Sequence, residues 1–107
     1  MVRALAQPDV FTAIADPTRR RLVDLLLGGD RSVTDLARDF ANSVPAISQH
    51  LRLLREVGLV DERQSGRKRF YRLHPKALQP VHDWVAVYQK FWDERFDALE
   101  RHLEENE

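Results

Sequence analysis

The chain has 107 residues, no cysteine and a formal net charge of zero at pH 7. This length fits one domain with a modest core, and the lack of cysteine excludes disulfides and thiolate metal sites. No apolar run approaches the roughly 18 residues of a membrane span, and the N-terminal residues lack the apolar segment of a signal peptide. We therefore expect a single domain over residues 1–107 that is cytoplasmic and has no membrane partner.

The zero net charge hides an uneven distribution along the chain. Residues 1–74 carry 13 Lys and Arg against 9 Asp and Glu, whereas residues 75–107 carry 4 against 8. Residues 63–74 hold five basic residues and no acidic one. This asymmetry predicts a basic body that faces DNA and an acidic tail that points away from it. Ordinary scatter of surface charge is the alternative.

The first predicted elements are a short helical stretch and a capped helix. Residues 1–15 carry an apolar pattern typical of one or two helical turns. Asp16 and Pro17 then predict a helix start, because Asp is a favoured N-cap and Pro at the first helical position loses no hydrogen bond. Gly28 and Gly29 end this helix. Its buried face consists of Leu22, Val23, Leu25 and Leu26.

Two helices separated by a short turn follow. Ser32 caps the first, which is predicted over residues 32–40, and residues 41–43 form the turn. The second helix covers residues 44–57 and ends at Gly58, which suits a left-handed conformation. Two helices joined by about three residues have the spacing of a helix-turn-helix, whose second helix lies in the DNA major groove. The predicted buried stripe of this helix is Ile47, Leu51, Leu54 and Val57.

A basic hairpin comes directly after the second helix. Residues 59–64 and 68–73 have the pattern of two strands around a turn at Ser65 and Gly66. Three cations, Arg67, Lys68 and Arg69, lie at the predicted tip. The sequence therefore predicts a mostly α-helical fold with a β-hairpin wing, a winged helix-turn-helix of five or so helices and a two-stranded wing.

The candidate DNA contacts are the exposed residues of the second helix and the wing. Recognition helices contact bases with their N-terminal half, Gln and Arg pair with adenine and guanine, and helix N-termini bind phosphate. An Arg in a narrow minor groove is favoured electrostatically. Each of these residues has an alternative as a solvated surface residue. The predicted contacts are Ser43, Pro45, Ala46, Ser48, Gln49, Arg52, Arg67, Lys68 and Arg69.

The last helix is predicted over residues 79–105, because Pro80 blocks a helix interior before it. Its apolar face is broader than one edge of a small domain normally covers, which predicts a dimer interface. Packing only on its own subunit is the alternative. A two-fold dimer also matches a palindromic operator with half-sites about 34 Å apart. The predicted interface residues of this helix are Val81, Trp84, Val85, Tyr88, Trp92, Phe96 and Leu99.

The sequence predicts neither an enzyme nor a cofactor. No Ser/His/Asp cluster, paired carboxylates, Gly-rich phosphate loop or metal-ligand set occurs at motif spacing. His50 has no ligand partner nearby in sequence, so we expect a structural, hydrogen-bonding histidine. No catalytic residue, no metal and no cofactor are therefore expected.

Four segments together resemble the ArsR/SmtB family of bacterial repressors. They are residues 11–22 (FTAIADPTRRRL), 33–37 (VTDLA), 48–60 (SQHLRLLREVGLV) and 66–73, and they keep the order of the family over about residues 8–75. The resemblance implies a homodimeric winged-helix repressor that leaves its operator when an effector binds. It also implies pairing through the first and last helices, which adds Val10 and Ile14 to the predicted interface.

The chain departs from the metal-sensing members of that family. Ser32, Val33 and Thr34 stand where those members have a Cys-x-Cys on the third helix. In the last helix His82 is followed eleven positions later by Asp93 rather than by a second His, and His102 has no matching partner. The resemblance therefore implies the non-metal-sensing type.

The sequence as a whole predicts a sequence-specific DNA-binding regulator, most simply a homodimeric repressor. It binds a palindromic operator through residues 43–57 and the wing at residues 63–70, and is nucleoid-associated when bound. The expected partners are double-stranded DNA, a second copy of the chain and an unidentified small-molecule effector. The alternative is a winged-helix module that binds another protein through its aromatic last helix.

Overall fold

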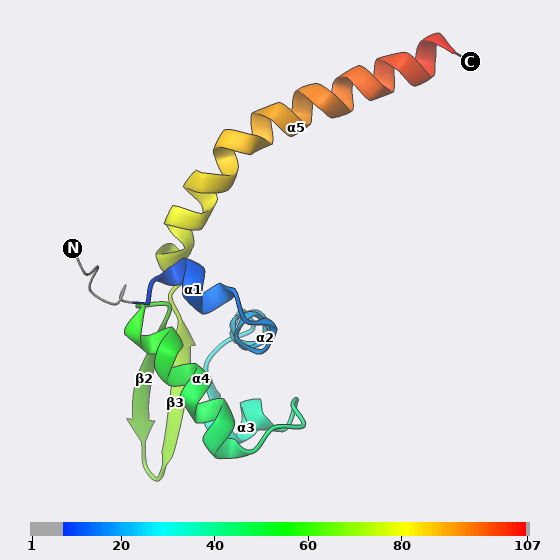
Figure 1. Ribbon diagram of the computed structural model, residues 1–107. Helices are drawn as coiled ribbons and strands as arrows, with labels where there is room; N and C mark the ends of the chain where they lie inside the picture. The colour runs from blue at the N-terminus through cyan, green and yellow to red at the C-terminus, as the bar shows by residue number, and fades with distance from the viewer. Residues whose placement is uncertain (1–7, 107) are drawn as a thin grey trace, which may run out of the picture.

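The computed structural model describes residues 8–106, which form a small helical body, a β-hairpin and a long final helix (Figure 1). The fold class predicted from the sequence is confirmed. The elements in chain order are α1 (Val10–Ile14), α2 (Pro17–Leu26), β1 (Arg31–Ser32), α3 (Val33–Ala37), α4 (Val44–Glu56), β2 (Val60–Ser65), β3 (Lys68–Leu73), the 3-10 helix η1 (Pro75–Leu78) and α5 (Gln79–Glu105).

Side-chain caps start the first four α-helices. Each capping oxygen accepts a hydrogen bond from the backbone N–H three residues later, which satisfies one of the free donors at a helix start. Gly58 follows α4 with φ of 79°, the left-handed conformation that the sequence predicts. The capping residues are Asp9, Asp16, Ser32 and Ser43.

The core lies among helices α1–α4 and is closed on one side by the base of the hairpin. Ile47, Leu51 and Leu54 of α4 are fully buried, which confirms the predicted stripe, and Val57 is half-buried at its end. Tyr71 reaches this core from β3. Burial of such side chains contributes roughly 1.5–3 kcal/mol each, so the position of α4 is set mainly by this stripe. The other fully buried large side chains are Leu22, Leu36, Leu59 and Val60.

Two elements differ from the prediction. The wing belongs to a three-stranded antiparallel sheet of order β1-β3-β2, in which Arg31 pairs with Tyr71 and Ser32 with Phe70. A two-residue strand is too short to show the alternation that marks a strand in sequence. Helix α3 ends at Ala37, and residues 38–40 form a turn rather than the predicted last helical turn.

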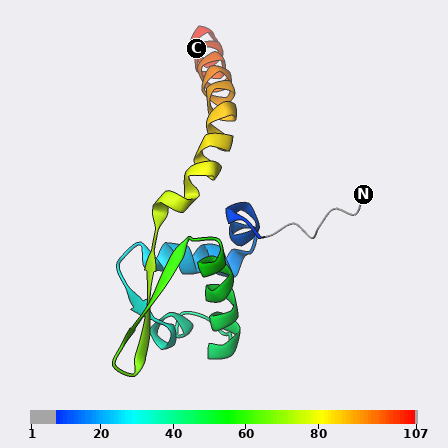
Figure 2. The same ribbon diagram turned by 90° about the vertical axis from the view of Figure 1, so that its left-hand side faces the viewer.

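Helix α5 leaves the body soon after it starts (Figures 1 and 2). Val81 and Val85 are half-buried, but every residue from Ala86 to Glu105 is exposed. The radius of gyration is 19.0 Å, against about 13 Å for a compact domain of 100 residues. None of the helices within residues 8–106 is both long and apolar enough to cross a bilayer.

Candidate nucleic-acid interface

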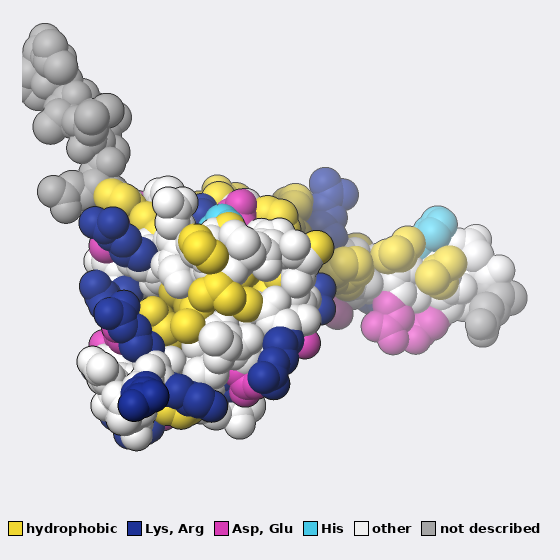
Figure 3. Space-filling model, turned by 90° about the horizontal axis from the view of Figure 1, so that it is seen from below, with side chains coloured by type: hydrophobic (Ala, Val, Ile, Leu, Met, Phe, Trp, Pro, Cys, Tyr) yellow, Lys and Arg dark blue, Asp and Glu magenta, His cyan; other side chains and the backbone are white. Residues whose placement is uncertain are grey.

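The N-terminal half of α4 and the tip of the β2–β3 hairpin lie at the same end of the molecule, opposite α5 (Figures 1 and 2). Figure 3 looks onto this end and shows Lys and Arg side chains spread around it, with a few Asp and Glu side chains beside them and uncharged side chains over the centre. This face therefore combines a helix end with dispersed positive charge, as a surface for a polyanion requires.

Helix α4 presents a mixed polar and apolar surface at its start. The Ser43 Oγ accepts a hydrogen bond of 3.3 Å from the backbone N–H of Ala46 and so caps the helix. Pro45 and Gln49 are exposed, whereas Ala46 and Ser48 are half-buried. Arg52 is exposed on the next turn, and its Nε lies 3.5 Å from Glu56 Oε1.

The cations of the wing fall into two groups. Arg67 and Lys68, at the tip, are exposed and make no ion pair with any residue among 8–106. Arg69, one residue further along β3, has its Nε 3.3 Å from Glu62 Oε1. The three predicted wing contacts are therefore not equivalent, since Arg69 pairs with a carboxylate of the same hairpin.

Asp30 holds two more cations at the base of the wing. Its carboxylate accepts hydrogen bonds of 3.2 and 3.1 Å from Arg72 and lies 3.7 Å from Arg63. The hydrogen bond from Arg72 lowers the pKa of Asp30 below its usual value. Because Asp30 precedes β1, this contact ties the hairpin to the helical body.

Comparison with known proteins identifies the family. Residues 16–62 match the model of the arsR family of bacterial regulatory proteins. The chain is 40% identical over 80 residues to the transcriptional repressor SdpR of Bacillus subtilis (strain 168), covering 75% of this chain and 89% of that protein. The chain belongs to the ArsR family. Over 86 residues it is 46% identical to the HTH-type transcriptional regulator Rv2034 of Mycobacterium tuberculosis (strain ATCC 25618 / H37Rv), covering 79% of this chain and 78% of that one.

A solved structure agrees with this assignment. The ArsR-like transcriptional regulator from Rhodococcus sp. RHA1 matches this ArsR-family chain with a TM-score of 0.68 at 32% identity, covering 89% of this chain and 87% of that one. The protein is thus a DNA-binding transcriptional repressor with a winged helix-turn-helix, and its family consists of regulators rather than enzymes. The predicted family and function class are confirmed.

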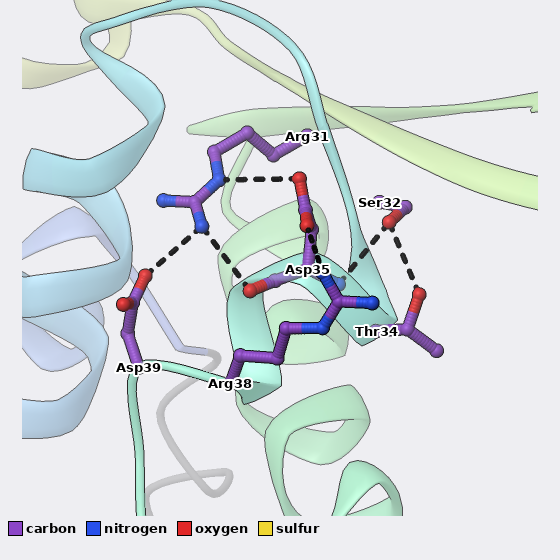
Figure 4. A network of polar contacts seen from close by, with 6 residues as sticks. All are labelled: Arg31, Ser32, Thr34, Asp35, Arg38 and Asp39. Atoms are coloured by element: carbon purple, nitrogen blue, oxygen red, sulfur yellow. Dashed lines mark hydrogen bonds and ion pairs between the residues drawn. The ribbon is translucent and has the colours of Figure 1, made fainter.

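In this ArsR-family protein, α3 is held by the polar network of Figure 4. Arg31 donates hydrogen bonds of 2.9 Å to Asp39 Oδ2 and 3.1 Å to the backbone oxygen of Asp35. The Arg38 guanidinium also lies 3.2 Å from Asp35 Oδ1. These contacts connect β1, α3 and the turn before α4, and so fix the first helix of the helix-turn-helix. The sequence did not reveal this role of Arg31, which depends on the chain folding back after α3.

The hydroxyl groups at the start of α3 are engaged with each other and with the helix. Ser32 Oγ lies 3.2 Å from Thr34 Oγ1 and accepts a hydrogen bond from the N–H of Asp35 (Figure 4). These are the positions at which the resemblance places the Cys-x-Cys of metal-sensing members. Across the described part of the chain, residues 8–106, no group of three or more His, Asp or Glu side chains is placed to hold a metal ion.

His50 links α4 to the junction between α1 and α2. The Nη1 of Arg19 lies 3.3 Å from His50 Nδ1, and Asp16 Oδ2 lies 4.0 Å from the same atom. The Nε of Arg19 donates a hydrogen bond of 2.7 Å to the backbone oxygen of Ala13 at the end of α1. The predicted hydrogen-bonding role of His50 is confirmed. The Arg19 guanidinium also donates to the backbone oxygen of Thr12, so this side chain turns toward the backbone of α1.

A second surface of the protein is aromatic and lies on α5. The Trp84 ring meets Phe11 of α1 edge-on at 6.0 Å between centroids, and Tyr88 at 5.6 Å. Tyr88 in turn stacks near Trp92 at 6.5 Å. All four side chains are at least 39% exposed. Of the other predicted interface residues, Phe96 and Leu99 are exposed, Ile14, Val81 and Val85 are half-buried, and Val10 lies in the core of its own subunit.

Proposed function

We propose that the protein represses transcription as a homodimer bound to a palindromic operator, and is associated with the nucleoid when bound. The observation that carries the proposal is that the N-terminus of α4 and the tip of the hairpin both lie at the end of the molecule opposite α5 (Figures 1 and 2). In this arrangement α4 enters the major groove while the wing reaches the neighbouring backbone. The proposed DNA contacts are Ser43, Pro45, Ala46, Ser48, Gln49, Arg52, Arg67, Lys68 and Arg69.

Each part of this surface has its own task in the proposal. Gln49 is exposed one turn into α4, and its amide matches the donor and acceptor pair of adenine in the major groove. Ser43 and the N-terminus of α4 favour a phosphate, because free backbone N–H groups and the helix dipole attract anions. Arg67 and Lys68 supply charge that no carboxylate among residues 8–106 neutralises.

The aromatic face of α5 supports the homodimer. An exposed ladder of Trp84, Tyr88 and Trp92, continued by Phe96 and Leu99, is far more apolar than a solvated helix normally tolerates. Partnering with a second α5 and with α1 around Phe11 would bury this ladder and place two recognition helices on one duplex. That a small-molecule effector alters the pairing of the two chains stays a prediction.

Fluorescence anisotropy with the protein's own upstream intergenic DNA tests the function. We expect two subunits per site and tighter binding than to a scrambled duplex. The affinity falls steeply with salt, because each phosphate contact contributes about −0.9 to the logarithmic slope. The double variant R67A/K68A should reduce the slope by about 2, whereas Gln49→Ala should reduce discrimination by roughly 1–3 kcal/mol with little change in slope.

Equal binding to both duplexes at every salt concentration would contradict the proposal. The aromatic face would then indicate a protein-binding module. Charge reversal at Arg67 and Arg69 separates the two functions, because it removes DNA binding and spares an apolar interface.

A further inference from the structure

One carboxylate joins the recognition helix to the wing. Glu62 on β2 forms an ion pair through Oε2 with Arg55, near the end of α4, and through Oε1 with Arg69 on β3 at 3.3 Å. Its side chain is only 18% exposed, although those of Arg55 and Arg69 are 50% and 63% exposed. The two guanidinium groups therefore shield the carboxylate from water.

The position of Glu62 follows from the register of the hairpin. Glu62 pairs with Tyr71, and Gln64 pairs with Arg69, so Glu62 and Arg69 are diagonal neighbours on the same face of the hairpin. Tyr71 is buried in the core, and its burial together with the charge of Glu62 raises its pKa. Glu62 thus lies beside a buried core residue, Tyr71, so its position is fixed. The two arginines that it binds are fixed relative to the core in turn.

We propose that Glu62 is a positioning residue that sets the specificity of DNA binding. It fixes the wing against α4 and limits phosphate binding by Arg55 and Arg69 on duplexes other than the operator. The inference rests on the proposed function, because it assigns a role within the same DNA-binding surface.

The pairing of these two arginines with an internal carboxylate explains why Glu62 raises specificity. Contacts between cations and phosphates are independent of sequence and supply essentially all non-specific affinity. An arginine held by an internal carboxylate must give up that partner before it binds a phosphate. Base contacts, by contrast, depend on the recognition helix and the wing docking together in one geometry. Glu62 therefore weakens binding to random duplex and preserves binding to the operator.

The test compares Glu62→Gln with Asp61→Asn. Both variants remove one negative charge from β2, but Asp61 lies on the opposite face, where it pairs with His74. We expect Glu62→Gln to bind a scrambled duplex about tenfold more tightly, with a salt slope steeper by about 1–2, and to lose about tenfold in the ratio of specific to non-specific affinity. Asp61→Asn should keep the wild-type ratio and slope.

A second variant, Arg55→Ala, tests the positioning role without removing the carboxylate. It breaks the link between α4 and the wing while Arg69 stays paired, so operator binding should fall severalfold at an unchanged salt slope. Circular dichroism of each variant verifies the fold.

Three outcomes would overturn the inference about Glu62. They are equal effects of Glu62→Gln and Asp61→Asn, an unchanged affinity ratio in Glu62→Gln, or wild-type operator binding in Arg55→Ala. The proposed function fails separately, when the wild-type protein itself shows no preference for its upstream DNA.

Discussion

At the scale of single residues, Ser43 combines a structural and a proposed binding role. Its hydroxyl caps α4, and the same helix end is the proposed phosphate site. Ser43→Ala should therefore lower the free energy of unfolding by about 1 kcal/mol and weaken operator binding. Ser43→Asp separates the roles, because Asp keeps the cap and favours the helix dipole but repels phosphate.

Urea unfolding and anisotropy on the same samples measure both effects. We expect Ser43→Asp to match or exceed wild-type stability and to bind the operator at least severalfold more weakly. Wild-type affinity in Ser43→Asp would mean that no phosphate approaches this end of α4.

Residue-level prediction from the sequence succeeded where the partners are local. The caps at Asp16 and Ser32 are visible because donor and acceptor lie three residues apart. Polar contacts that cross the fold left no such pattern: Arg72 and Asp30 are 42 positions apart, and Arg19 and His50 are 31 apart. Glu62 was missed for the same reason, since its role depends on where α4 meets the hairpin.

At the scale of elements, the strands and α4 were predictable, because their apolar periodicity and turn residues are strong. Strand β1 was not, because two residues carry no periodicity and its pairing with β3 arises only after folding. The same contact region contains Asp30, which connects the turn before β1 to the base of the wing through Arg72 and Arg63. The wing is therefore held from both faces, by Asp30 on one and Glu62 on the other.

Asp30→Asn tests the anchoring of the wing and carries a definite pH dependence. The folded-state pKa of Asp30 lies below its ordinary value of 3.8, chiefly because Arg72 donates hydrogen bonds to it. The charged carboxylate therefore stabilises the folded protein above pH 3.8, and this contribution is lost as the pH falls through the folded-state pKa. The difference in free energy of unfolding between wild type and Asp30→Asn should be largest near pH 7 and shrink below about pH 3.8.

Urea titrations at several pH values measure that difference, and hydrogen exchange of the β2 and β3 amides locates it. We expect faster exchange at the hairpin in Asp30→Asn, with little change in α2. A difference that stays constant from pH 7 to below pH 3 would show that the carboxylate charge contributes nothing to the anchor.

At the scale of the whole molecule, the protein consists of a packed body and a helix that the body does not cover. The apolar face of α5 was predictable from the sequence, because tryptophans at helical spacing are visible without a structure. The sequence also predicted that this face is an interface, which stays a prediction. It did not reveal that Val10 belongs to the core, since a short helix gives no indication of which side faces inward. The separation of α5 from the core makes the association of two chains testable without unfolding either one.

Trp92→Asp should separate the proposed dimer into folded monomers. Trp92 is 46% exposed in the single chain and lies beyond the last half-buried residue of α5, so the core does not depend on it. An aromatic side chain at the centre of an interface contributes roughly 2 kcal/mol or more. It occurs twice in a two-fold dimer, so its loss should raise the dimer Kd about 1000-fold.

Ala86→Asp is the control, because it introduces the same charge about 120° away around the helix and should leave the dimer intact. Sedimentation velocity distinguishes the two variants, and the Trp92→Asp monomer should keep its helical circular dichroism while losing tight operator binding. A dimeric Trp92→Asp protein would place the subunit contact elsewhere and leave the aromatic face free for a different partner.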